Sequence, residues 1–204
     1  MVSLELRDIS KSFGSREVLS GINVLMDSGC LAVTGPNGSG KSTLLRIIAG
    51  LLAPTGGQVV LRSDGRPAPP ELRRDLVGLV APDLALYDEL SAIENLRFFA
   101  RVRGLRTADA ELAASLEKLG LAGRENDRLG SYSSGMRQRV KCAFALLHDP
   151  PVLLLDEPSA NLDETGAAAL DSIVAEHRQR GIVVLASNHP AELRSGDCVL
   201  QLGD

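Results

Sequence analysis

The chain has 204 residues, 44% hydrophobic and 24% charged, which is ordinary for a folded protein and excludes a disordered one. This length predicts one domain, or one domain with an insertion, and a core that needs no disulfide or metal crosslink. The 22 basic and 26 acidic residues give a net charge of −4, which argues against binding of nucleic acid through overall charge.

The chain carries no sign of membrane insertion or secretion. No apolar run approaches the roughly 20 residues that span a bilayer, and the first ten residues lack the basic and apolar regions of a signal peptide. We therefore expect a soluble intracellular protein, unless a partner holds it at a membrane. Cys30, Cys142 and Cys198 are odd in number and far apart, so we expect reduced, buried packing residues.

The first part of the chain predicts strands around one glycine-rich turn and one helix. Residues 3–9 alternate apolar and polar side chains, as a half-exposed strand does. A helix begins near Ser42 and ends near Gly50, and the proline-rich stretch 66–72 reads as a loop. The predicted strands of this part are 3–9, 17–26, 30–34, 58–62 and 76–80.

The middle of the chain, from about 88 to 148, predicts helices and no strand. Each helix has a residue type that caps helix N-termini well, because its side-chain oxygen accepts a backbone N–H. The predicted caps are Ser91 with Glu94 as a capping box, then Thr107, then Ser133 or Ser134.

Strands return after the helical block. Residues 152–156 form a buried strand, a helix runs from about Glu164 to Arg180, and 182–187 form the last buried strand. Apolar strands separated by helices predict an α/β core with a mostly parallel sheet and an N-terminal antiparallel β region. We expect one domain over 1–204, with core residues at about 1–87 and 149–204 and an inserted helical subdomain at about 88–148.

Residues 35–42 match the phosphate-binding pattern GxxxxGK[ST] between a predicted strand and a predicted helix. The glycines let backbone N–H groups turn toward an anion, and the helix N-terminus adds positive potential. Lys41 is placed to reach the β- and γ-phosphates, and the Ser42 hydroxyl to bind Mg²⁺. The predicted nucleotide-binding residues are Gly35, Pro36, Asn37, Gly38, Ser39, Gly40, Lys41, Ser42 and Thr43.

The strand 152–156 ends in two carboxylates, Asp156 and Glu157. Asp156 would lie at the carboxyl edge of the sheet as a ligand of Mg²⁺, and Glu157 would polarise an attacking water. A strand often ends in a charged turn, so this pattern alone is weak. Together with the phosphate loop it predicts a P-loop nucleotide hydrolase.

Residues 132–139 read Tyr-Ser-Ser-Gly-Met-Arg-Gln-Arg, which also fits an ordinary capped helix with a basic face. In its place before the carboxylate-tipped strand, the tract resembles the LSGGQ signature of the ATP-binding-cassette (ABC) ATPases. Ser133 and Gly135 match that signature, whereas Tyr132, Ser134 and Met136 depart from it. The resemblance extends from Leu4 to Gly203 and implies that Ser133, Ser134 and Gly135 contact ATP.

Further roles follow from this resemblance. Phe13 resembles the aromatic that stacks on adenine, with Val18 beside it, although a plain core aromatic is the alternative for Phe13. Residues 159–163 resemble the D-loop, and His189 resembles the switch histidine that contacts the γ-phosphate. A lone histidine is more often structural, as we expect of His148 and His177.

One feature of the family is missing after strand 76–80. The family places there a glutamine that touches Mg²⁺ and the transport partner, whereas this chain has Pro82 and Asp83. Asp83 could supply an oxygen ligand in its place.

The resemblance implies that two cassettes pair head to tail, as a homodimer or a heterodimer, and that each signature closes over the other's ATP. The catalytic residues would be Lys41, Glu157 and His189. The leading function is the ATPase subunit of a transporter, peripheral on the cytoplasmic membrane face and coupled to a separate membrane permease. The tracts 132–140 and 92–99 look most like small exporter-type cassettes such as the haem-exporter ATPase. The alternatives are a non-transport ABC ATPase or a small-molecule kinase.

Overall fold

The computed structural model describes residues 2–194 and 196–203. Residues 1, 195 and 204 of the expected domain 1–204 lie outside the described residues. The chain divides into two compact units. The first comprises Met1–Leu79, Pro151–Glu157 and Val174–Asp204, and the second comprises Val80–Pro150 and Pro158–Ile173. In the part of the chain that the structure describes, no helix is long and apolar enough to cross a membrane.

An antiparallel sheet forms one layer of the first unit, in the order β2-β1-β4-β5. Apolar side chains alternate along its central strand, so that Leu4 and Leu6 are buried and face the core. Leu4 pairs with Met26 on one side and with Leu61 on the other. The strands are β1 (Val2–Phe13), β2 (Arg16–Met26), β4 (Gly56–Ser63) and β5 (Arg66–Pro67).

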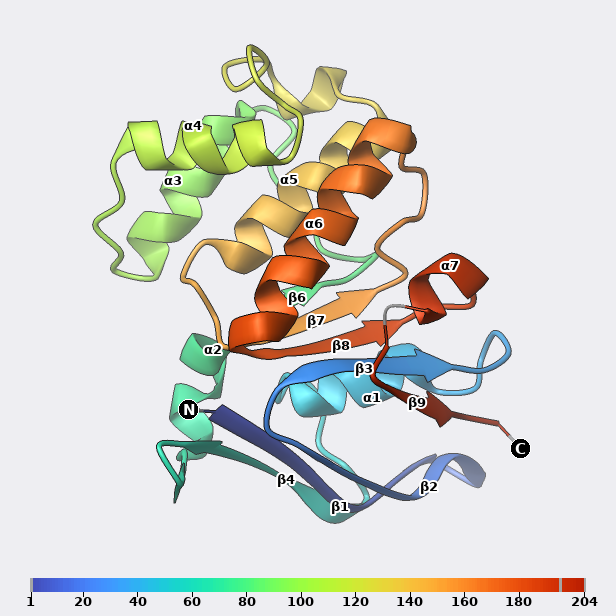
Figure 1. Cartoon of the computed structure of the whole chain (residues 1–204). Helices are drawn as coiled ribbons and strands as arrows, with labels where there is room; N and C mark the ends of the chain where they lie inside the picture. The colour runs from blue at the N-terminus through green and yellow to red at the C-terminus, as the bar shows by residue number, and fades with distance from the viewer. Residues whose placement is uncertain (1, 195, 204) are drawn as a thin grey trace. The chain divides into compact units, whose positions relative to one another are not determined.

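A second, mainly parallel sheet follows the order β6-β7-β8-β3-β9 (Figure 1). All residues of β7 and β8 are buried, as expected for strands covered on both faces. The register pairs Asp156 at the end of β7 with Ala186 at the end of β8. The strands are β3 (Gly29–Thr34), β6 (Val77–Val80), β7 (Val152–Asp156), β8 (Ile182–Ala186) and β9 (Cys198–Gln201).

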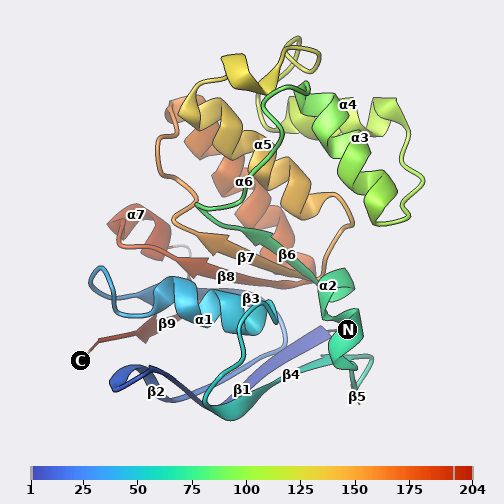
Figure 2. The same ribbon diagram turned by 180° about the vertical axis from the view of Figure 1, so that it is seen from behind.

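Helix α1 (Lys41–Ile48) lies between the two sheets, as the two opposite views agree (Figures 1 and 2). Leu44, Leu45 and Ile48 of this helix join buried residues of both sheets in one core. This packing places the N-terminus of α1 beside the carboxyl end of β3. Short helices α2 (Arg73–Leu76) and α7 (Pro190–Leu193) also belong to the first unit, whereas α6 (Glu164–Arg180) begins in the second and ends in the first.

The second unit is helical, as its sequence predicts. Ser91 and Glu94 form the expected capping box at the start of α3 (Ala92–Val102). Ser133 rather than Ser134 caps α5 (Ser134–Leu146), because its hydroxyl accepts the Met136 N–H at 3.2 Å. The remaining elements are α4 (Asp109–Lys118) and the 3-10 helix η2 (Leu129–Ser131).

Some local predictions were wrong. The stretch 66–72 is not only a loop: Asp64 and Gly65 adopt positive φ angles of 51° and 76°, which form a tight hairpin turn into β5. The 3-10 helix η1 (Pro70–Leu72) follows, because proline fits the first turn of a helix. Helix α4 begins at Asp109 and not near Thr107, because Glu111 accepts the N–H of Ala108.

The end of the chain also differs from prediction. Strand 182–187 ends at Ala186 and is not the last, because β9 follows and pairs with β3. Cys30 and Cys142 are buried as expected, but Cys198 is exposed. Its exposure follows from its place on an edge strand, where only Leu200 is partly buried.

Candidate functional site

The glycine-rich turn between β3 and α1 is built around backbone conformations that favour glycine. Gly35, Gly38 and Gly40 have positive φ angles of 149°, 84° and 102°. A Cβ atom on Gly40 would lie 2.8 Å from Leu19 and 2.9 Å from Val18, and one on Gly35 would lie 2.3 Å from the Leu202 carbonyl oxygen. The loop therefore requires glycine at these positions for its shape.

Lys41 is buried at the first position of α1, with 7% of its surface exposed. Its ammonium donates a hydrogen bond of 2.7 Å to the carbonyl of Gly35, six residues earlier in the same loop. A buried ammonium held across a loop of turned backbone and beside a helix N-terminus attracts an anion. This geometry suits a phosphate group.

A cavity of about 480 Å³ opens over this loop. Phe13 and Val18 contribute its apolar wall, and Phe13 is 50% exposed. The alternative that Phe13 is a plain core aromatic is therefore wrong. The lining residues are Phe13, Arg16, Val18, Asn37, Gly38, Gly40, Lys41, Ser42, Thr43 and Glu157.

Two polar contacts at this cavity were missed by the sequence analysis. Arg16 donates a long hydrogen bond of 3.5 Å to the Gly38 carbonyl. The Asn188 side-chain amide donates to Asn37 Oδ1 at 3.3 Å. Neither residue has a sequence signal of its own, because each meets the loop only through the folding of a distant segment.

The two carboxylates occupy different environments at the carboxyl end of β7. Asp156 is buried, with 2% of its surface exposed. Glu157 has a positive φ of 46°, its N–H donates to the Ala186 carbonyl at 2.9 Å, and its carboxylate lies 3.8 Å from the Lys41 ammonium. The ladder between β7 and β8 thus continues through the Glu157 N–H. A positive φ is uncommon for a residue other than glycine, and here it occurs where the carboxylate approaches the phosphate loop.

Burial raises the pKa of the Glu157 carboxyl above its usual range. The Lys41 ammonium opposes this shift, whereas the carboxylates of Glu192 and Asp156 add to it. Glu192 was not predicted: it is 8% exposed, and both its carboxylate oxygens are buried without a hydrogen-bond partner among the described residues. Perturbation of this kind is common where a carboxylate acts on a substrate.

His189 lies in the segment that follows β8 and precedes α7. Ser187 fixes this segment, since its N–H donates to the Val33 carbonyl at 3.0 Å and its hydroxyl accepts the His189 N–H at 2.9 Å. His189 is exposed, and it lowers the pKa of the Glu157 carboxyl, against the effect of burial. The fold therefore brings Lys41, Glu157 and His189 to one region of the first unit.

Ser133, Ser134 and Gly135 lie in the second unit and are not among the residues that line the described cavity. Ser133 and Ser134 are exposed. Gly135 is buried, and a Cβ on it would lie 2.5 Å from the carbonyl oxygen of Asn161, in the segment 159–163. Glycine is therefore required where the signature-like turn touches the D-loop-like segment.

The segment where the family places a glutamine is also in the second unit. Pro82 and Asp83 are exposed. The carbonyl oxygens of Ala81 and Pro82 both accept hydrogen bonds from Lys141 of α5, at 3.4 and 2.7 Å.

The residues present fit ATP and Mg²⁺. The glycine cradle, with no room for a Cβ at Gly35 or Gly40, provides backbone N–H donors for phosphate oxygens. Ser42 and Asp156 offer hard oxygen ligands of the kind that Mg²⁺ prefers. Among residues 2–194 and 196–203, no group of three or more His, Cys, Asp or Glu could hold a metal ion by itself.

The chain is similar in sequence to ATP-binding proteins of transport systems. The chain is 32% identical over 189 residues to the lantibiotic transport ATP-binding protein SrtF of Streptococcus pyogenes, covering 91% of this chain and 80% of the relative. It is 43% identical over 172 residues to the sulfate/thiosulfate import ATP-binding protein CysA of Methylococcus capsulatus, covering 79% of this chain and 48% of the relative.

A solved ATP-binding subunit of an ABC transporter is similar in structure, with a TM-score of 0.85 and 30% identity over 98% of this chain and 85% of that one. The sequence model of the family described as ABC transporter matches residues 19–160, which is more than half of the chain. The protein therefore belongs to the ABC transporter family and is an ATPase of that family.

Proposed function

We propose that this chain is the ATP-hydrolysing subunit of a transporter whose membrane-spanning subunits are separate chains. The observation that supports this most directly is the proximity of the Lys41 ammonium and the Glu157 carboxylate, which lie 3.8 Å apart and both line the cavity at the phosphate loop. The Lys41 ammonium suits the phosphates of ATP, and the Glu157 carboxylate suits the attacking water. The two relatives described above are named for different transported substrates, so their names favour transport as the general activity.

Each side chain has a separate task in the proposed reaction. Phe13 and Val18 hold the adenine, and residues 35–43 hold the phosphates through backbone N–H groups and the Lys41 ammonium. Mg²⁺, held by Ser42 and Asp156, would offset negative charge on the phosphates. The ionised Glu157 accepts a hydrogen bond from the attacking water and orients it, and His189 donates to the γ-phosphate.

A second cassette completes the site in this proposal. The exposed hydroxyls of Ser133 and Ser134 and the N-terminus of α5, which begins at Ser134, form a surface suited to a phosphate. We infer that this surface closes over ATP bound to a partner cassette, in a homodimer or a heterodimer. An unpaired chain would then bind ATP and hydrolyse it slowly.

The proposed membrane contact lies on the second unit. Tyr87 and Phe98 are 47% and 41% exposed, and their rings meet edge to face at 5.2 Å. Two half-exposed aromatic rings in contact form an apolar surface that fits a helix of a permease. We propose that residues 84–87 and Phe98 receive it, and that the chain is therefore peripheral on the cytoplasmic membrane face. We retain 1–204 as one cassette, with residues 88–148 as its helical subdomain.

Co-purification from detergent-solubilised membranes tests this proposal. The tagged chain should retain an integral membrane protein with several spans, and addition of that protein should stimulate ATP hydrolysis. Cysteines placed at Tyr87 and Phe98 should crosslink to the same protein, whereas a cysteine at exposed Val199 of β9 is the matched control. Recovery of a soluble partner only would favour a non-transport ATPase and contradict the proposal.

A further inference from the structure

Helix α5 carries two basic residues, Arg137 and Lys141, that bind the two ends of one segment, residues 81–88. They are four residues apart and therefore lie on the same face of the helix. The Lys141 ammonium donates to the Pro82 carbonyl at 2.7 Å and to the Ala81 carbonyl at 3.4 Å. Arg137 forms an ion pair with Asp88 at the other end of the segment.

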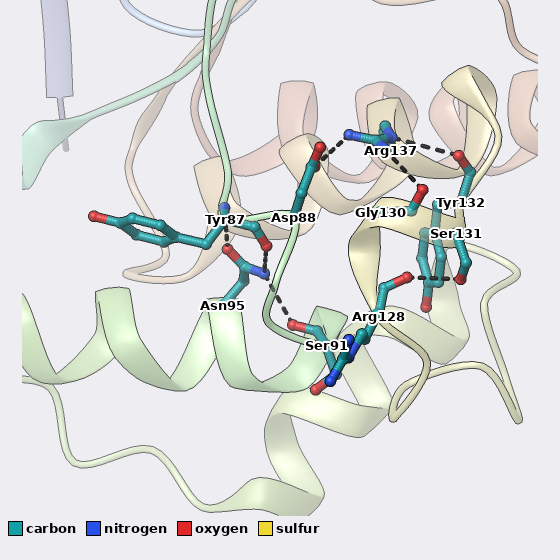
Figure 3. Close-up of polar contacts among 9 residues, drawn as sticks. All are labelled: Tyr87, Asp88, Ser91, Asn95, Arg128, Gly130, Ser131, Tyr132 and Arg137. Carbon is teal, nitrogen blue, oxygen red and sulfur yellow. Dashed lines mark hydrogen bonds and ion pairs between the residues drawn. The ribbon is translucent and has the colours of Figure 1, made fainter.

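The Asp88 end is joined to the turn that precedes the signature-like residues (Figure 3). Arg137 also donates to the Gly130 carbonyl at 3.1 Å and, through Nε, to the Tyr132 carbonyl at 3.4 Å. The Gly130 N–H in turn donates to the backbone carbonyl of Asp88 at 2.9 Å. One guanidinium thus holds the 81–88 segment and the turn that leads into Ser133.

The same segment presents an aromatic residue to solvent. Asn95 is fully buried, and its amide accepts the Tyr87 N–H at 2.8 Å and donates to the Tyr87 carbonyl at 2.9 Å (Figure 3). These two bonds fix the Tyr87 backbone to α3, while the ring remains exposed and touches Phe98. The exposed Tyr87 ring is therefore carried by a segment whose backbone is bonded to α3.

We propose that Arg137, with Lys141, is a positioning residue that makes residues 81–88 and the turn 129–133 move as one body. A partner that displaces the Tyr87–Phe98 surface would thereby move Ser133 and Gly135. This inference rests on the proposed function, because it names how the membrane partner regulates the signature surface. An isolated exposed ion pair contributes little to stability. The coupling comes from the shared guanidinium, whose contacts all lie on the two segments it joins.

Amide hydrogen exchange on the isolated chain tests the clamp directly. In Arg137→Ala and Asp88→Ala, exchange of the amides of residues 129–136 should rise by on the order of tenfold, while the phosphate loop 35–42 stays as in the parent. Arg137→Lys keeps the positive charge but loses the forked donors of the guanidinium. Its exchange rate should therefore lie between those of the parent and of Arg137→Ala. The double variant should exchange no faster than Arg137→Ala, because both changes break the same link.

The matched control is Arg97→Ala, which breaks a two-bond pair with Asp109 in the same unit, at 2.9 and 2.8 Å. It should leave exchange at 129–136 unchanged. Parent-like exchange there in both Asp88→Ala and Arg137→Ala overturns the clamp. An equal rise in the Arg97→Ala control also overturns it, because the effect is then general loosening of the unit.

Mixed dimers test whether the clamp serves the signature surface. In the mixed dimer of Arg137→Ala with Lys41→Ala, one intact phosphate loop meets one intact signature. Once Arg137→Ala homodimers are subtracted, this mixed dimer should hydrolyse ATP at about half the rate of a parent dimer. The chain carrying both changes, mixed with the parent, pairs the intact loop with the altered signature in the mixed dimer. Once parent homodimers are subtracted, this second mixed dimer should hydrolyse ATP about tenfold more slowly than the first. Equal rates of the two mixed dimers would overturn the link from the clamp to the signature surface. A faster second mixed dimer, together with raised exchange, would overturn the head-to-tail pairing and leave the clamp standing.

Discussion

The Lys41 ammonium lies 3.8 Å from the Glu157 carboxylate in the first unit, although the two residues are 116 positions apart in the sequence. Neither group is placed by its neighbours in the chain alone. The turn after β3 places Lys41, and the ladder between β7 and β8 places Glu157. The short distance between the two charged groups therefore depends on the assembly of the parallel sheet.

Lys41→Ala should abolish most of the affinity for ATP and leave the fold intact. A hydrogen bond to a charged group contributes about 1.5–3 kcal/mol, so the dissociation constant should rise by about 10- to 150-fold. Calorimetric titration with ATP measures the affinity, and far-UV circular dichroism checks the fold. The assignment of the phosphate loop is wrong if the variant binds ATP as tightly as the parent.

Glu157→Gln should block hydrolysis without loss of ATP binding. The change removes the acceptor strength of the carboxylate and keeps its shape, and loss of one well-placed catalytic group costs about 10²- to 10⁴-fold in rate. Phosphate release measures the rate, and light scattering in Mg²⁺–ATP should show the blocked chain accumulating as a dimer. Undiminished phosphate release under conditions where the parent is active would exclude Glu157 as the residue that orients the attacking water.

The raised pKa of Glu157 predicts a stability difference that depends on pH. The folded state disfavours the ionised carboxyl, so ionisation of Glu157 lowers the free energy of unfolding above the raised pKa, and the loss vanishes below the unfolded pKa. Glu157→Gln should therefore unfold at a higher temperature than the parent at pH 7, and the difference should shrink toward pH 4. Glu17→Gln, at an exposed residue of β2, should show no such trend.

The same shift predicts the pH dependence of the reaction. The rate constant kcat should rise with pH as Glu157 loses its proton, with a midpoint above that of an ordinary glutamate. Hydrolysis measured from pH 5 to 8 gives the midpoint. The residual kcat of Glu157→Gln should not rise with pH in this range. A rise that persists in this variant would assign the titration to another group.

Phe13→Ala should weaken ATP binding and leave stability unchanged, because the ring is half exposed at the cavity. Stacking of an aromatic on a base contributes about 1–3 kcal/mol, or about 5- to 150-fold in affinity. Phe13→Trp keeps the stacking surface and should restore binding. Equal affinity of ATP and of inorganic triphosphate in the parent would contradict a role for Phe13 in holding the base.

Gly135→Ala should destabilise the second unit and displace the signature surface. The added Cβ would lie 2.5 Å from the Asn161 carbonyl, so the backbone must shift, at a cost of about 1–3 kcal/mol. A thermal unfolding scan should show a lower melting temperature by about 2–12 °C. Ser134→Ala, at the exposed neighbour, is the control and should melt with the parent.

Much of the candidate site was predictable because its signals are local. Gly35 to Ser42 are consecutive, and the strand before them and the helix after them have hydrophobic periods of their own. Asp156 ends a buried strand and Glu157 follows it directly, so their place at the sheet edge follows from the strand itself. The resemblance to the ABC ATPases then suggested roles for Phe13 and His189, and the fold brings both residues to the first unit.

Tertiary structure alone decided what depends on contacts between distant segments. The sequence predicted that Cys198 is buried, but the strand that carries it lies at a sheet edge.

Glu192 near Glu157, and Arg137 between Asp88 and Gly130, had no signal in the chain. Periodicity indicates which side of an element faces inward, and a cap indicates where a helix begins. Both signals depend on residues only a few positions apart. Which charged group meets which depends on the packing of whole elements, and only the folded chain determines it.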